Sequence, residues 1–109
     1  MHELSIAESV VDAVLERTGD APVACVRLRV GRLSGVVPDA LSFCFELVTA
    51  GTPLEGAALL IEEPGGRAHC RSCEREFALD DLFLLCECGS ADVEVLAGRE
   101  LHLASVEVR

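Results

Sequence analysis

The chain has 109 residues, half of them apolar, and its nine basic residues against nineteen acidic ones give a formal net charge of −10. This apolar fraction suffices for a buried core and excludes an intrinsically disordered chain. The negative charge disfavours binding to a nucleic-acid backbone or an anionic membrane, and four phenylalanines without tyrosine or tryptophan do not make a base-stacking platform.

The N-terminal part of the chain predicts an amphipathic helix from about Ser5 to Thr18. The segment Ser5-Ile6-Ala7-Glu8 fits a capping box, in which the serine is the N-cap and the glutamate reaches back from the third helical position. Gly19 and Pro22 stop the helix. Its apolar stripe recurs at four-residue spacing, at Ile6, Val10 and Val14.

A strand and a second helix are predicted next. Between Val23 and Leu33 the residues alternate with period two, so that one face is apolar and the other carries arginines. The second helix opens at Pro38, which suits a first helical position, and ends before Gly51. Its core face is predicted from the spacing i, i+3, i+4 and i+7 and consists of Leu41, Cys44, Phe45 and Val48.

Two further strands are predicted, Ala57–Glu63 and Leu101–Arg109. Together these elements favour the α+β class, with two helices packed on a three-stranded sheet. The clustered cysteines lie between the last two strands, which predicts an inserted, small zinc-ribbon-like lobe. We therefore expect an α+β domain over residues 1–65 plus 99–109, and a zinc-binding lobe over residues 66–98.

The lobe carries two close pairs of cysteines, in Cys70-Arg71-Ser72-Cys73 and in Cys86-Glu87-Cys88. Four thiolates at this spacing match a tetrahedral zinc site, and a lobe of about 33 residues needs such a site to fold. The second pair is tight because only one residue separates its thiols. A rubredoxin-like iron site, a redox-active thiol pair, a site lacking one ligand, and His69 in place of a thiolate stay open as alternatives.

Four sulfur ligands leave no open position for water on the metal, and the chain shows no nucleophile–base pair, so we expect no enzymatic activity. No apolar run reaches the roughly 18–20 residues that cross a bilayer, and Met1-His2-Glu3 lacks the basic and apolar regions of a signal peptide. We therefore expect a cytoplasmic protein whose thiols stay reduced. Cys25 and Cys44 are interpreted as ordinary thiols without a ligand role.

A histidine at position 2 of a free N-terminus can chelate a metal. The terminal amine, the amide nitrogen of His2 and its imidazole close adjacent rings around one ion, and Ni(II) and Cu(II) favour this square-planar coordination. A fourth donor can come from a further backbone amide, the Glu3 carboxylate or water. Residues 1–3 precede the predicted helix cap and are expected to be free to wrap around the ion. Taken alone, a histidine at this position is more often a solvated residue.

Several motifs occur together along the chain. It opens with Met1-His2-Glu3-Leu4-Ser5, carries the four clustered cysteines, and closes with Gly98-Arg99-Glu100-Leu101 and Ser105-Val106-Glu107-Val108. In this combination the whole chain resembles the HypA family, the nickel-delivery proteins of NiFe-hydrogenase maturation. Within that resemblance, residues 26–35 correspond to a first strand with its glycine turn, and residues 38–45 to a second helix.

The resemblance implies that the Met1 amine, His2 and Glu3 bind Ni(II). It also implies that structural zinc is held by Cys70, Cys73, Cys86 and Cys88. The implied partners are a HypB-type GTPase and the hydrogenase large-subunit precursor, with urease as a destination in some organisms. The negative charge predicts neither a nucleic-acid nor a membrane partner. The second cysteine pair departs from the family pattern, which usually has two residues between the thiols. The alternative function is a zinc-ribbon module for protein interaction or nucleic-acid binding without nickel, and the negative charge disfavours nucleic acid.

For two further features, the sequence leaves two interpretations open. His102 is expected to be a strand-end histidine packed near the domain junction, and a fourth nickel ligand or a pH-sensitive link is the alternative. A basic stripe is expected to pair with neighbouring carboxylates, with docking of an acidic partner as the alternative. This stripe consists of Arg27, Arg29 and Arg32.

Overall fold

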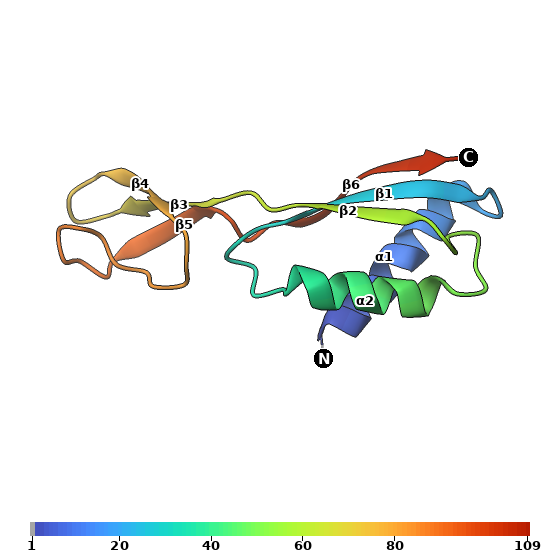
Figure 1. The fold of residues 1–109 in the computed structure, drawn as a ribbon. Coiled ribbons are helices and arrows are strands. Elements are labelled where there is room, and N and C mark those ends of the chain that lie inside the picture. Colours follow the sequence, from blue (N-terminus) through green and yellow to red (C-terminus); the bar gives the residue numbers. More distant parts are fainter. Residues whose placement is uncertain (1) are drawn as a thin grey trace. The chain divides into compact units, whose positions relative to one another are not determined.

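The computed structural model describes residues 2–109 and contains two helices and six strands (Figure 1). The strands form two three-stranded sheets, in the orders β2-β1-β6 and β4-β3-β5. This combination confirms the predicted α+β class. Among the described residues, neither helix is long and apolar enough to cross a bilayer. In chain order the elements are α1 His2–Thr18, β1 Val23–Val30, α2 Pro38–Thr49, β2 Ala58–Glu62, β3 Gly66–Cys70, β4 Glu76–Leu79, β5 Val93–Ala97 and β6 Leu101–Val108.

The chain divides into two compact units. The first consists of Met1–Leu28, Val36–Ile61 and His102–Arg109, and the second of Arg29–Gly35 and Glu62–Leu101. The second unit includes the turn after β1 because Leu33, 4 % exposed, belongs to its hydrophobic core. The division that we expect from the sequence, at residues 65/66 and 98/99, stays a prediction.

In the first unit, both helices lie on the same side of the β2-β1-β6 sheet and pack against each other (Figure 1). Helix α2 spans Pro38–Thr49, and its predicted start at Pro38 is confirmed, because proline at the first position lacks the N–H that would have no helical partner there. Leu41 and Phe45 are its most buried apolar residues, whereas Phe43 and Leu47 point to solvent. Burial of these apolar stripes supplies the main stabilisation of the unit.

The start of α1 corrects the sequence prediction. The helix begins at His2, so the predicted N-cap at Ser5 lies inside the helix and residues 2–3 do not precede it. Glu3 favours this earlier start because a carboxylate in the first turn complements the positive end of the helix dipole. Val14 is buried as predicted, but Ala7 and Val11 are buried in place of Ile6 and Val10, because packing against neighbouring elements selects which apolar side chains are covered.

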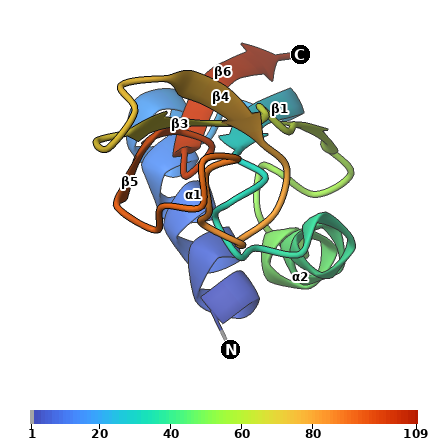
Figure 2. The same ribbon diagram turned by 90° about the vertical axis from the view of Figure 1, so that its left-hand side faces the viewer.

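The second unit is built on the antiparallel β4-β3-β5 sheet, in which β3 is the central strand (Figure 2). Ala68 pairs with Phe77 of β4 and Val95 of β5. The sequence analysis did not predict these strands, because each has only four or five residues and no long run of alternating apolar side chains. The core is correspondingly small, with Leu33, Ala68 and Leu79 at its centre.

Two glycines allow three chain segments to meet in the second unit. The N–H of Leu33 donates to the carbonyl of Gly98 at 2.7 Å. A Cβ on Gly98 would lie 2.7 Å from the Cα of Gly66 and 3.0 Å from Leu33 Cδ1, and Gly98 has a φ of +110°. A side chain at Gly66 would overlap Leu33 and the Leu79 carbonyl. These close approaches require glycine because the backbones and Leu33 fill the space.

We expect Gly98→Ala to destabilise the second unit by at least about 3 kcal/mol, because it combines an unfavourable φ with a steric overlap. Gly35→Ala is the matched control, since Gly35 has a φ of +80° and open space around its Cβ position. The control is expected to cost about 1–2 kcal/mol. Urea unfolding followed by circular dichroism measures both. Equal losses in the two variants would contradict the close packing at Gly98.

Candidate metal sites

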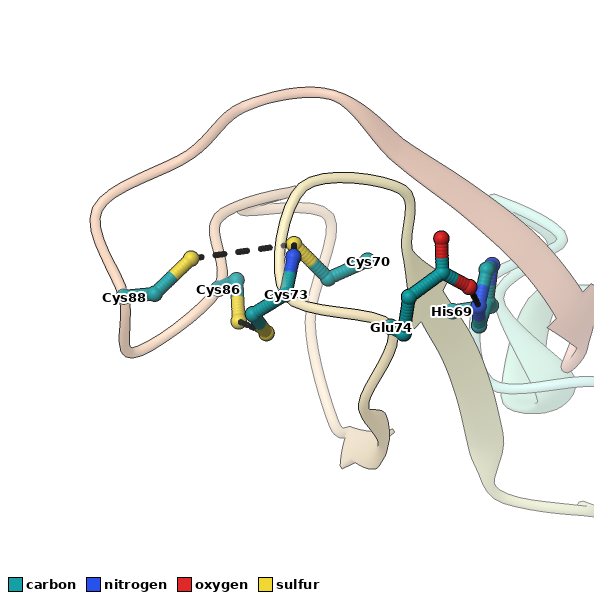
Figure 3. Close-up of polar contacts among 6 residues, drawn as sticks. All are labelled: His69, Cys70, Cys73, Glu74, Cys86 and Cys88. Atoms are coloured by element: carbon teal, nitrogen blue, oxygen red, sulfur yellow. Dashed lines mark hydrogen bonds and ion pairs between the residues drawn. The ribbon is translucent and has the colours of Figure 1, made fainter.

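Four cysteine sulfurs gather at one end of the second unit (Figure 3). Their Sγ atoms all lie within 4.8 Å of one another. The Sγ atoms of Cys70 and Cys88 are 3.7 Å apart, as are those of Cys73 and Cys86. All four cysteines that the sequence analysis selected are therefore brought into one group, with Cys70 and Cys86 buried and the other two exposed.

Two tight turns position these sulfurs. In the first, Glu74 N–H donates to the Cys70 carbonyl at 2.9 Å, and Glu74 adopts a left-handed φ of +64°. In the second, Gly89 N–H donates to the Cys86 carbonyl at 2.9 Å, and Gly89 has a φ of +91°. The Oγ atoms of Ser72 and Ser90 join the two turns at 2.8 Å. The turns thus present one cysteine pair each to a common centre.

The spacing fits a tetrahedral thiolate site. Four sulfurs that each lie about 2.3 Å from a zinc ion are about 3.8 Å apart, which agrees with the closest Sγ–Sγ distances of 3.7 Å. The short Cys86-Glu87-Cys88 segment is compatible with this spacing. Its Cys86 sulfur approaches Cys73, and its Cys88 sulfur approaches Cys70. Such a group can hold a divalent ion with no open coordination position.

The environment of the first pair favours an ionised thiol. The N–H of Cys73 points at the Cys70 sulfur at 3.5 Å, and this contact, together with the Ser72 N–H and the Cys73 and Cys88 thiols, lowers the pKa of Cys70 to about 6. The pKa of Cys73 is raised: the Arg75 N–H lowers it, but desolvation and the nearby Cys70 and Cys86 thiols raise it by more. The lowered pKa of Cys70 favours the thiolate form that binds a cation, and ligation of the remaining thiols displaces protons.

His69 lies beside the sulfur group and is not part of it. Its Nε2 atom is 3.1 Å from Glu74 Oε2, and the pair lies to one side of the cysteines (Figure 3). Among residues 2–109, the metal-ligand group contains the four cysteines alone. Sequence reasoning did not find the His69–Glu74 contact, because it depends on the left-handed turn at Glu74.

The residues predicted for nickel lie at the start of α1 in the first unit. Met1 is outside the described residues. The His2 side chain is 61 % exposed, and its Nε2 atom is 3.2 Å from Glu3 Oε2. The Glu3 side chain is only 12 % exposed, because its Oε2 atom accepts a hydrogen bond of 3.1 Å from the N–H of Val37, the N-cap of α2. Nothing in the sequence indicates this contact, since 34 positions separate the two residues.

The remaining candidates occupy ordinary positions. His102 is exposed on β6, so the expectation that its side chain is packed is wrong. Cys25 is buried, and Cys44 is half-buried on α2. In the predicted basic stripe, Arg29 Nε lies 3.1 Å from Glu62 Oε1, which supports pairing with neighbouring carboxylates at that position.

Comparison with known proteins identifies the family. A family model described as "Hydrogenase/urease nickel incorporation, metallochaperone, hypA" matches residues 1–108. The chain belongs to the HypA family. A hydrogenase maturation factor HypA of Streptomyces avermitilis is 54 % identical over 97 % of this chain and 86 % of its own length. One of Geotalea uraniireducens is 48 % identical over 99 % of both chains.

Solved structures of HypA proteins have the same fold. The solution structure of the Ni metallochaperone HypA from Helicobacter pylori has a TM-score of 0.66 and 22 % identity, covering 97 % of this chain and 96 % of that one. A second HypA solution structure has a TM-score of 0.67 at 23 % identity, covering 100 % and 97 %. At this identity the likeness concerns the fold alone.

In this HypA-family chain, the contact between Glu3 and Val37 is expected to depend on pH. The Val37 N–H holds the pKa of the Glu3 carboxyl below its ordinary value, so the hydrogen bond is present at neutral pH and is lost as the pH falls through that lowered pKa. The amide NMR resonance of Val37 should therefore titrate with a midpoint below that of an ordinary glutamate.

Glu3→Gln should abolish this titration, whereas Glu8→Gln on the exposed side of α1 should leave it unchanged. A Val37 resonance that is insensitive to acid, or one that titrates equally in Glu3→Gln, would contradict the hydrogen bond.

Proposed function

We propose that this protein carries Ni(II) on its N-terminal segment, through the Met1 amine, His2 and Glu3, for NiFe-hydrogenase maturation. The observation that carries the proposal is an accessible imidazole at position 2, 61 % exposed at the N-terminal end of α1, in a chain of the nickel-incorporating HypA family. Imidazole and backbone nitrogen are donors that suit Ni(II) in a square-planar arrangement.

The helical start at His2 is compatible with this chelate. The first four N–H groups of an α-helix have no partner within the helix. The amides of His2 and Glu3 are therefore not consumed by helical hydrogen bonds and can give up their protons to nickel. The Met1 amine and the His2 imidazole then complete adjacent chelate rings, and the negative charge of the chain favours the cation.

Glu3 takes part through its backbone in this proposal. Its carboxylate accepts the Val37 N–H and lies near the His2 imidazole, so ligation by that carboxylate would break a contact that joins α1 to the start of α2. The Glu3 amide supplies the fourth nitrogen without that loss. The carboxylate acts as a positioning group, since it holds the first turn of α1 in place.

The four cysteines bind zinc as a structural ion in this proposal. Bound zinc would cross-link two turns of a unit whose apolar core is centred on only three buried side chains. Zinc and the nickel cargo use different donors, since thiolates form the sulfur set of the second unit and nitrogens form the proposed nickel site of the first.

Nickel passes from the N-terminal segment to a HypB-type GTPase and the hydrogenase large-subunit precursor, with urease as a further destination. The exposed position of His2 supports transfer, because an incoming ligand can reach the ion and displace one donor at a time. This role needs no catalytic group, and we expect no enzymatic activity, with the protein acting in the cytoplasm.

A Ni(II) titration of untagged protein tests the carrier function, after the native N-terminus has been confirmed by mass spectrometry. One nickel per chain is expected, and His2→Ala should weaken binding by at least about tenfold, since a lost ligand exceeds about 1.4 kcal/mol. A square-planar ion should be diamagnetic and leave the NMR lines of α1 sharp.

His102→Ala is the matched control, because it removes an exposed histidine of the same unit, and it should bind nickel as the parent does. Equal nickel binding by the parent and His2→Ala would move the site elsewhere and overturn the proposal.

The zinc assignment has a separate test. Native mass spectrometry should find one zinc per chain in the parent and in Cys44→Ser, whose thiol lies outside the group. Cys88→Ser should lose zinc, and the amide NMR signals of β3, β4 and β5 should lose their dispersion because the unit unfolds without the cross-link. Full zinc occupancy in Cys88→Ser would exclude the four-sulfur site.

A further inference from the structure

The loop between β4 and Cys86 exposes an unusual amount of apolar surface. It reads Asp80-Asp81-Leu82-Phe83-Leu84-Leu85, and the name "apolar loop" refers to these residues. Leu82 is 63 % exposed, Phe83 72 % and Leu85 44 %. Large apolar side chains that are exposed side by side in a small protein mark an interaction surface more often than single exposed ones.

Two hydrogen bonds and one packed side chain constrain the apolar loop. The Asp81 carboxylate accepts a hydrogen bond of 2.9 Å from the Phe83 N–H, and the Leu85 N–H donates to the Phe83 carbonyl at 2.9 Å. Leu84 turns inward and packs on the core around Ala68 and Leu79. A segment ordered in this way loses little conformational entropy when it binds, so its apolar tip is prepared for a partner.

The charges beside the tip are not neutralised within the unit. Four arginines of this unit form ion pairs with other carboxylates, at N–O distances of 3.0–3.4 Å. In the described part of the chain, neither Asp80 nor Asp81 forms an ion pair. The pairs are Arg29–Glu62, Arg67–Glu76, Arg71–Asp92 and Arg75–Glu87.

This charge distribution selects the kind of partner. A second copy of the chain would bring the same two carboxylates and a net charge of −10 against this surface, and an anionic bilayer would repel it as well. A protein surface with lysine or arginine around an apolar pocket would gain both the burial of the side chains and the pairing of the aspartates.

We propose that the apolar loop is a docking site for a basic partner protein, in which Leu82, Phe83 and Leu85 enter an apolar pocket and Asp80 and Asp81 pair with cations at its rim. This inference concerns the second unit and does not rest on nickel binding at His2. Metal ligation at the neighbouring Cys86 would hold the end of the loop, so docking requires the zinc-loaded protein.

The probe is a designed amphipathic helix of leucine and lysine, and calorimetry measures its affinity for the zinc-loaded protein. Phe83→Ala should weaken binding by at least about tenfold. Phe43→Ala is the matched control, because Phe43 is 63 % exposed on α2 in the first unit, and it should change the affinity by less than about twofold. Asp80→Asn with Asp81→Asn should weaken binding and reduce its dependence on salt.

Circular dichroism and zinc content establish that the variants are folded, which is expected because Phe83 leaves no cavity when it is truncated at an exposed position. A matched leucine–glutamate helix should not bind. Equal losses in Phe83→Ala and Phe43→Ala, or an unchanged affinity in the double asparagine variant, would overturn the proposal. Self-association through Phe83 in sedimentation equilibrium would identify a second copy of the chain as the occupant of this surface. Phe83-dependent binding to phosphatidylglycerol vesicles would identify a membrane instead. Either result would overturn the proposal of a basic partner protein.

Discussion

The convergence of four cysteine sulfurs within 4.8 Å is the constraint on which the second unit depends. The apolar core of this unit is centred on Leu33, Ala68 and Leu79, which is too little buried surface to fix three short strands by itself. Two turns, each shaped by a residue with positive φ, bring the sulfurs together. A bound cation would join the four sulfurs into a cross-link between the two turns, so folding and metal binding are one process in such a lobe.

In the first unit the proposed nickel ligands lie at the N-terminal end of α1, apart from the buried core. The buried rows of α1 and α2 supply the core, and the Glu3 carboxylate fixes the first turn of α1 against the N-cap of α2. His2 stays accessible next to this fixed point. Under the proposal, an ion bound there would be exposed enough for transfer, and the fixed first turn would reduce the entropy that its ligands lose on binding.

Electrostatics connects the proposed activities of the two units. All nine basic residues of the chain are arginines, opposed by nineteen acidic residues, and several arginines are occupied in surface ion pairs. Such exposed pairs add little stability, but they leave the unpaired carboxylates to dominate the surface potential. A cationic cargo and a basic protein partner are both attracted by this potential, whereas nucleic acid and anionic lipid are repelled.

The sequence by itself determined the features that depend on local spacing. These are the α+β class, helix α2 from Pro38, the three strands of the first sheet and the grouping of four cysteines as ligands. The tertiary structure alone decided the start of α1 at His2, the burial of Ala7 and Val11 in place of Ile6 and Val10, the β4-β3-β5 sheet, and the contact of Glu3 with Val37. Periodicity and turn residues act over a few positions, so they can be read from the sequence. A hydrogen bond across 34 positions, or the choice between two adjacent apolar rows, depends instead on which surfaces and backbone groups the packed elements leave available.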